Sequence, residues 1–193
     1  MTETKHTAPP DSHARGALRP RWPTLAGVGF AALVAFDLAA GVDLAPVLAA
    51  SAVVYLGAAA LRKQAAAWPM FFATVVVITL ARLIDDRLDA TWILLGGGVA
   101  LAIFGLVRGA IRPAYGLPLQ SIALLGFGVA AMVAMLINAE FGGYLVAAGL
   151  LGHTAWDAHH YRTNRVVTRS MAEFCMVLDT ALAIVIVLVT ALP

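Results

Sequence analysis

The sequence predicts an all-α protein, a polytopic integral membrane bundle of seven transmembrane helices. Of its 193 residues, 61% are hydrophobic and only 12% are charged, whereas a soluble domain carries about 25% charged residues. Several apolar stretches approach or exceed the roughly 18–20 residues that a helix needs to cross a bilayer. We expect each of them to be a helix, because a lone strand in lipid would leave its backbone groups unpaired.

The elements follow from the positions of polar residues, prolines and aromatic residues. Residues 1–22 are polar, basic and proline-containing, and we expect a disordered tail. Residues 23–193 form the transmembrane domain. Prolines such as Pro23 and Pro118 fall near segment starts, where a missing N–H costs least, and aromatic residues such as Trp92 lie at segment ends, as in an aromatic belt. The expected segments are 23–41, 44–61, 68–84, 91–107, 118–138, 143–159 and 171–192.

Orientation follows from the positive charges. With seven helices, the tail and three loops lie on one side and carry 11 of the 13 lysines and arginines; Arg82 and Arg87 fall on the other. Because positive loops stay in the cytoplasm, the N-terminus is predicted to be cytoplasmic and the C-terminus external. The preference for arginine over lysine indicates a bacterial protein, and hence a multi-pass protein of the plasma (inner) membrane. The three loops are 61–67, 108–117 and 160–170.

The first segment has a second interpretation. A basic tail before an apolar run also fits a signal peptide, cleaved near Ala39 and Ala40. Its removal would leave six helices in the same orientation. The length of the tail and Asp37 inside the run favour a retained helix.

The stretch GHTAWDAHHYRTNR, residues 152–165, contains the main candidate site. If the sixth helix continues to about residue 160, His153, Asp157 and His160 fall at positions i, i+4 and i+7 and share one face. His159 points elsewhere. Ionisable groups inside membrane segments are expensive and by default mark a site or a buried pair.

The seventh segment runs back along the sixth and brings further polar groups. A connection of about ten residues makes the two helices neighbours. At about 1.5 Å per residue, Asp179 falls at the depth of His153, Cys175 at that of Asp157 and Glu173 at that of His160. Further polar side chains at compatible depth are Tyr55, Gln120 and Ser121.

Three interpretations of this group remain open. Imidazoles and carboxylates suit Zn²⁺ or Fe²⁺, and His153, Asp157 and His160 would then be the metal ligands. Asp179 or Glu173 would complete the metal shell or act as a general base. The same side chains also suit a proton relay, since histidine titrates near neutrality. In the third interpretation they form a self-satisfied polar pair that specifies helix packing.

A second polar layer lies toward the opposite membrane surface. Asp37 and Arg82 fall at similar depth and are candidates for a buried ion pair. The letters DDRLD at 85–89 match the DDxxD pattern that binds Mg²⁺ and diphosphate, but no second acidic cluster faces them, which favours a solvated loop. The sequence has no phosphate-binding glycine loop, no GxSxG and no nucleic-acid motif, so no nucleic-acid partner is expected.

In architecture the chain resembles the superfamily of seven-helix hydrolases that includes alkaline ceramidases and adiponectin-receptor-like proteins. The resemblance rests on the helix count and on membrane-embedded histidines and acids, and it implies zinc near the cytoplasmic leaflet. That superfamily draws histidine ligands from an early helix as well as the last one. Here histidines occur only in the tail and at 153–160, so none of its residues is carried over.

Three functions follow from these observations. The first is a metal-dependent enzyme embedded in the membrane and acting on a lipid or another apolar substrate. The second is a proton- or cation-coupled binding or transport protein. The third is an accessory subunit of a larger membrane complex. The expected partners are membrane lipids, together with either further copies of this chain or a larger complex.

Overall fold

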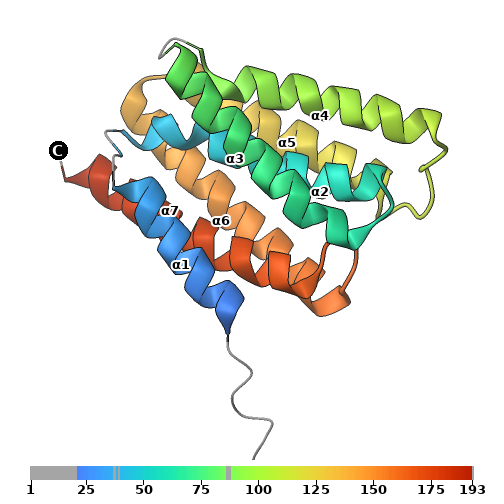
Figure 1. Cartoon of the computed structure of the whole chain (residues 1–193). Helices are drawn as coiled ribbons and strands as arrows, with labels where there is room; N and C mark the ends of the chain where they lie inside the picture. The colour runs from blue at the N-terminus through green and yellow to red at the C-terminus, as the bar shows by residue number, and fades with distance from the viewer. Residues whose placement is uncertain (1–20, 37, 39, 86–87, 193) are drawn as a thin grey trace, which may run out of the picture.

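The computed structural model describes residues 21–36, 38, 40–85 and 88–192, and the elements of secondary structure in this part of the chain are all helices, without strands. Its helices run roughly alongside one another as one bundle (Figure 1). Five of them are long and apolar enough to cross a membrane. The α-helices are α1 (Trp22–Ala35), α2 (Ala45–Ala60), α3 (Ala67–Ile84), α4 (Ala90–Val107), α5 (Leu117–Leu136), α6 (Ala139–Thr163) and α7 (Arg169–Ala191), with 3₁₀ turns at Gly41–Leu44 and Gln64–Ala66.

The first and sixth helices differ most from the predicted segments. Helix α1 has 14 residues and ends at Ala35 rather than at 41, so it is about 21 Å long, shorter than a bilayer core of roughly 30 Å. Helix α6 has 25 residues and exceeds the predicted 143–159 at both ends. The predicted tail lies outside the described residues apart from Arg21 and Trp22, which begins α1.

Local hydrogen bonds explain where the last two helices begin and end. The side chain of Asn138 accepts a hydrogen bond from the backbone N–H of Phe141 at 3.0 Å, which starts α6 four residues earlier than predicted. Asn164 ends α6 in the left-handed conformation, with φ of 51°. Thr168 caps α7 through the N–H of Met171 at 3.3 Å. The two caps leave a short connection, and α6 packs against α7 as predicted.

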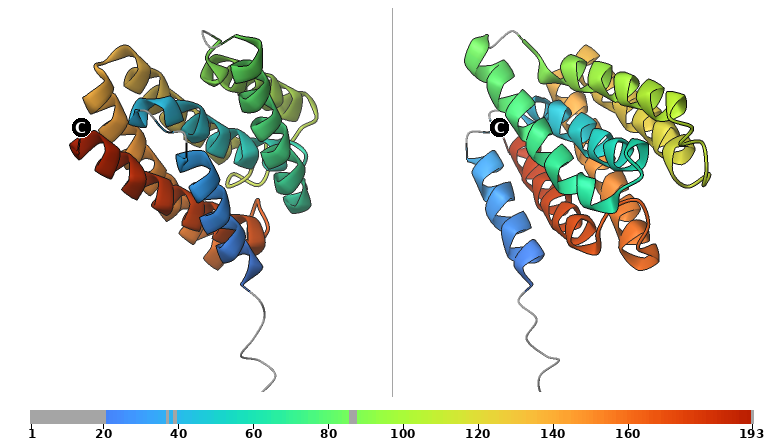
Figure 2. Two further views of the ribbon diagram at one scale, coloured as in Figure 1. Left: turned by 60° about the vertical axis from the view of Figure 1, so that its left-hand side comes forward. Right: turned by 45° about the vertical axis from the view of Figure 1, so that its right-hand side comes forward.

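Helix α2 lies in the middle of the bundle, with α3, α4, α5 and α6 around it (Figure 2). It is buried on nearly every side, as expected of a helix that is hydrophobic all round. Its many alanines permit this, because small residues let neighbouring backbones approach closely in lipid. Helix α1 lies at the outside of the bundle, against α7. The central position of α2 decides which side chains reach the polar face of α6.

The turn before α2 is folded into the bundle. Its first residue, Gly41, lies so close to Ile186 and Gly143 that a Cβ atom there would collide with the Ile186 side chain. The backbone N–H of Ala40 donates to the carboxylate of Asp43 at 2.9 Å, which holds the turn. The chain therefore enters α2 through a tight turn instead of continuing α1 to residue 41.

Candidate metal centre

The predicted polar stripe is present on one face of α6, and this face is turned into the bundle. His153 and Asp157 have no solvent-exposed surface, and His160 is 2% exposed. His159, which the helical spacing places on another face, is exposed. The stripe is therefore enclosed by neighbouring helices and does not face lipid or water.

Helix α7 adds the second carboxylate. Nδ1 of His153 lies 2.8 Å from Oδ2 of Asp179 and 3.3 Å from Oδ2 of Asp157. One ligand atom of each of these residues lies within 4.8 Å of those of the other two, and this is the one such group found among the described residues. The predicted pairing of Asp179 with His153 by depth is confirmed. We call His153, Asp157 and Asp179 the HDD group.

The central helix supplies a hydroxyl to the same group. The hydroxyl of Tyr55 on α2 donates to Oδ1 of Asp157 at 2.5 Å, and the Tyr55 side chain is fully enclosed. Its ring packs edge-on against the rings of His153 and His160, with centroid separations of 5.2 and 4.9 Å. Tyr55 thus holds one oxygen of Asp157 and leaves the other facing His153.

Several polar atoms of the HDD group have no hydrogen-bond partner. They are Nε2 of His153, Oδ2 of Asp157 and Oδ1 of Asp179. Buried polar atoms are almost always paired, and an unpaired one costs about 1–3 kcal/mol. Within the described residues, neither aspartate forms an ion pair with a lysine or arginine. The group therefore combines unpartnered polar atoms with two carboxylates that no lysine or arginine neutralises.

A divalent cation fits this donor set. Zn²⁺ binds nitrogen and oxygen ligands at about 2.0–2.2 Å, so two ligands in a tetrahedral or octahedral arrangement lie about 3.0–3.5 Å apart. The separations of 2.8 and 3.3 Å from Nδ1 of His153 are close to that spacing, so Nδ1 would be the ligand and Nε2 would carry the ring proton. A neutral imidazole and two carboxylates would balance a charge of +2. Imidazole and carboxylate ligands suit Zn²⁺ and Fe²⁺ alike.

His160, the third predicted ligand, has other partners. Its Nδ1–H donates to the backbone carbonyl of Trp156 at 2.9 Å, since a carbonyl only accepts. The indole N–H of Trp156 donates to Oε1 of Gln120 at 3.3 Å, which leaves the amide nitrogen of Gln120 to donate to Nε2 of His160 at 3.3 Å. Both ring nitrogens are thus occupied, and His160 lies outside the HDD group.

The structure does not bring the other predicted base into the site. Glu173 accepts a hydrogen bond from the hydroxyl of Thr24 on α1 at 2.5 Å, on the other side of α7 from the stripe. The predicted pair of Asp37 and Arg82 is not tested, because Asp37 lies outside the described residues. Arg82 itself is exposed.

A groove whose lining is mostly apolar, with Asp43 and Arg82 as its charged residues, opens on the side of the bundle. It has a volume of about 390 Å³ between α1 and α3, where Phe30 and Ile78 are among its walls. A smaller hollow of about 40 Å³ shares both of these residues and ends at Cys175 and Leu178. No residue of the HDD group lines either hollow.

Comparisons with protein families, with curated proteins and with solved structures find no match to this chain.

The hydrogen bond from Tyr55 gives a first testable prediction. We expect Tyr55→Phe to lower the free energy of unfolding by about 1–3 kcal/mol, because it leaves Oδ1 of Asp157 buried without a donor. Unfolding of the purified protein in mixed micelles, followed by circular dichroism, measures the change. Tyr144→Phe is the matched control, since Tyr144 is exposed. Equal losses in the two variants would show that this hydrogen bond does not stabilise the fold.

Proposed function

We propose that this protein is a metal-dependent enzyme embedded in the membrane and acting on a lipid or another apolar substrate. The observation that carries the proposal is the HDD group, whose three residues meet with unpartnered lone pairs in a fully buried position. A buried set of this kind calls for a cation or a proton. We place Zn²⁺ or Fe²⁺ there, held by His153, Asp157 and Asp179.

We further propose seven membrane-embedded helices with a cytoplasmic N-terminus in the plasma membrane. The charges of the three loops that join α2 to α3, α4 to α5 and α6 to α7 support this orientation. Asp157 lies six residues from the end of α6 that leads into the last of these loops, about 9 Å along the helix. The HDD group would then lie in the cytoplasmic half of the membrane.

The side chains around the group suggest separate roles in such an enzyme. A bound divalent ion would polarise a substrate carbonyl or activate a water molecule. Tyr55 orients Asp157 through its hydroxyl, which makes it a positioning residue. Asp179 has one oxygen at His153 and one unpartnered, so the free oxygen is the candidate general base. The groove between α1 and α3, whose lining is mostly apolar, would accept the apolar part of a substrate from the lipid.

The test is the metal content of the purified protein. Plasma mass spectrometry on detergent-solubilised protein should find about one zinc or iron per chain in the wild type. His153→Ala should reduce it at least tenfold, since the imidazole is the central ligand. His159→Ala is the control, because His159 is an exposed histidine on the same helix, and its metal content should equal that of the wild type. Equal metal in all three proteins, or none in any, would contradict the proposal.

A proton- or cation-coupled transporter is the second candidate, and one observation favours it. The 2.8 Å contact between His153 and Asp179 is also an ordinary hydrogen-bond distance, so a shared proton accounts for that contact. This candidate predicts pH-dependent flux in proteoliposomes of metal-free protein, lost in Asp179→Asn. If the protein holds no metal, carries no flux and tolerates substitution of the HDD group, the role of an accessory subunit is favoured, and co-purification with partners tests it.

A further inference from the structure

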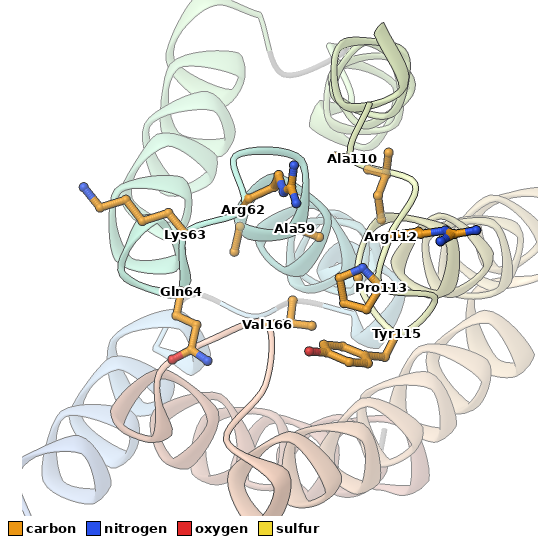
Figure 3. Close-up of a pocket in the computed structure, with 12 residues that line it drawn as sticks. Ala59, Arg62, Lys63, Gln64, Ala110, Arg112, Pro113, Tyr115 and Val166 are labelled. Atoms are coloured by element: carbon orange, nitrogen blue, oxygen red, sulfur yellow. The ribbon is translucent and has the colours of Figure 1, made fainter. Parts of the chain in front are cut away.

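A second polar site lies at the end of the bundle where three loops meet. The connections after α2, after α4 and after α6 surround a hollow of about 220 Å³ (Figure 3). Ala59 and Leu117 contribute apolar surface from the ends of α2 and α5, and Val166 contributes from the last loop. We call this hollow the loop pocket. It shares no residue with the HDD group.

Positive charge surrounds the loop pocket without compensation. Arg62, Lys63 and Arg112 are among its lining residues, and no aspartate or glutamate is. Within the described residues, none of the three has an ion-pair partner. Figure 3 shows Arg62 at the end of α2, with Lys63 and Arg112 at opposite sides of the hollow and their charged ends directed away from it. All three side chains are exposed and long, so contact with a bound anion would require Lys63 and Arg112 to turn inward.

The wall of the pocket adds one further positive charge. The guanidinium of Arg165 lies 4.6 Å from the ring centroid of Tyr115, a lining residue, which holds a fourth positive charge beside the hollow. Helix α5 begins at Leu117 in the same wall, but its N-terminus adds little: Pro118 has no N–H, and the next two N–H groups already donate to backbone carbonyls.

We infer that the loop pocket binds a phosphate group, carried either by the headgroup of an anionic lipid or by a soluble phosphate ester. Retention of loops in the cytoplasm explains positive charge on each loop separately. This retention does not require that charges from different loops line the same hollow, or that the hollow has no aspartate or glutamate in its lining. Arginine pairs with phosphate through two parallel hydrogen bonds, which suits Arg62 and Arg112. This inference does not depend on the metal centre.

Binding to the full-length protein tests the inference, with two kinds of probe. Inorganic phosphate and glycerol phosphate, titrated by calorimetry in a zwitterionic detergent, report on a soluble ligand. Native mass spectrometry from nanodiscs that mix phosphatidylglycerol with phosphatidylcholine reports on a retained lipid. We expect at least one kind of probe to bind, and the double variant Arg62→Ala, Arg112→Ala to bind it at least tenfold more weakly.

Matched variants separate a specific pocket from general surface charge. Arg162→Ala, Arg169→Ala removes the same charge from the helix ends on either side of the last loop, at exposed arginines that do not line the pocket. Its affinity should stay within about twofold of wild type. Arg62→Lys, Arg112→Lys keeps the charge and should recover most of the binding. Absence of binding to both kinds of probe, or equal losses in the two alanine pairs, would overturn the inference.

Discussion

Replacing Asp179 with alanine is expected to lower the free energy of unfolding by about 1–3 kcal/mol, because the buried ring nitrogen of His153 loses its nearest hydrogen-bond partner. Asp179 lies 2.8 Å from Nδ1 of His153, and both side chains are fully buried. Without Asp179, His153 keeps only its longer, 3.3 Å contact with Asp157. A bound cation would increase the loss further, because the variant would also lose a ligand.

Two further variants identify the origin of that loss. Asp179→Asn removes the charge but keeps an oxygen that can accept a hydrogen bond from His153. The free energy of unfolding should therefore fall less than in the alanine variant. Glu140→Ala removes an exposed carboxylate from the first turn of α6 and should change the free energy by less than about 0.5 kcal/mol. Reversible unfolding in mixed micelles compares the three. A loss below about 1 kcal/mol for Asp179→Ala would contradict the structural role of the pair.

The second large effect is expected at Gly142, where α6 passes the end of α5. A Cβ atom at this position would overlap the backbone carbonyl oxygen of Ala134, and a backbone atom cannot move aside as a flexible side chain can. Gly142→Ala should therefore lower the free energy of unfolding by about 1–3 kcal/mol, in the range of other overpacked sites. The same unfolding experiment measures it.

Gly97 provides the matched control for this substitution. It lies inside α4, and a Cβ atom there would meet nothing within 4 Å. Alanine is a better helix former than glycine, so Gly97→Ala should leave stability unchanged or raise it by up to about 1 kcal/mol. If both variants destabilise the protein equally, the close approach of α6 to α5 is not the cause.

Part of the candidate site was predictable because it depends on two helices joined by a short connection. Helical spacing placed His153 and Asp157 on one face, and depth along the antiparallel neighbour selected Asp179. The structure confirms this arrangement with contacts of 2.8 and 3.3 Å from His153. Local geometry was sufficient for this prediction, because the rise per residue and the length of the loop together determine which side chains of the two helices lie at the same depth.

The remaining partners were not predictable in this way. Depth alone made Tyr55, Gln120 and Ser121 equal candidates, yet only the Tyr55 hydroxyl reaches Asp157. Ser121 instead bonds the carbonyl of Leu117 in its own helix. Glu173 has the right depth for His160 but faces α1. The depth of a residue in the membrane does not say in which direction around the helix axis its side chain points. That direction depends on how the helix packs against its neighbours.

The sequence by itself determined the helical class, the apolar helices, the polar stripe of α6 and its antiparallel neighbour α7. These properties follow from composition, from periodicity and from the length of a connection, all of which are local. Only the tertiary structure decided that α2 occupies the centre, that Tyr55 completes the HDD group while His160 pairs with Gln120, and that three loops enclose a cationic hollow. Seven largely apolar helices have similar surfaces, so their order in space depends on close fits such as that of Gly142 against Ala134, which no sequence period encodes.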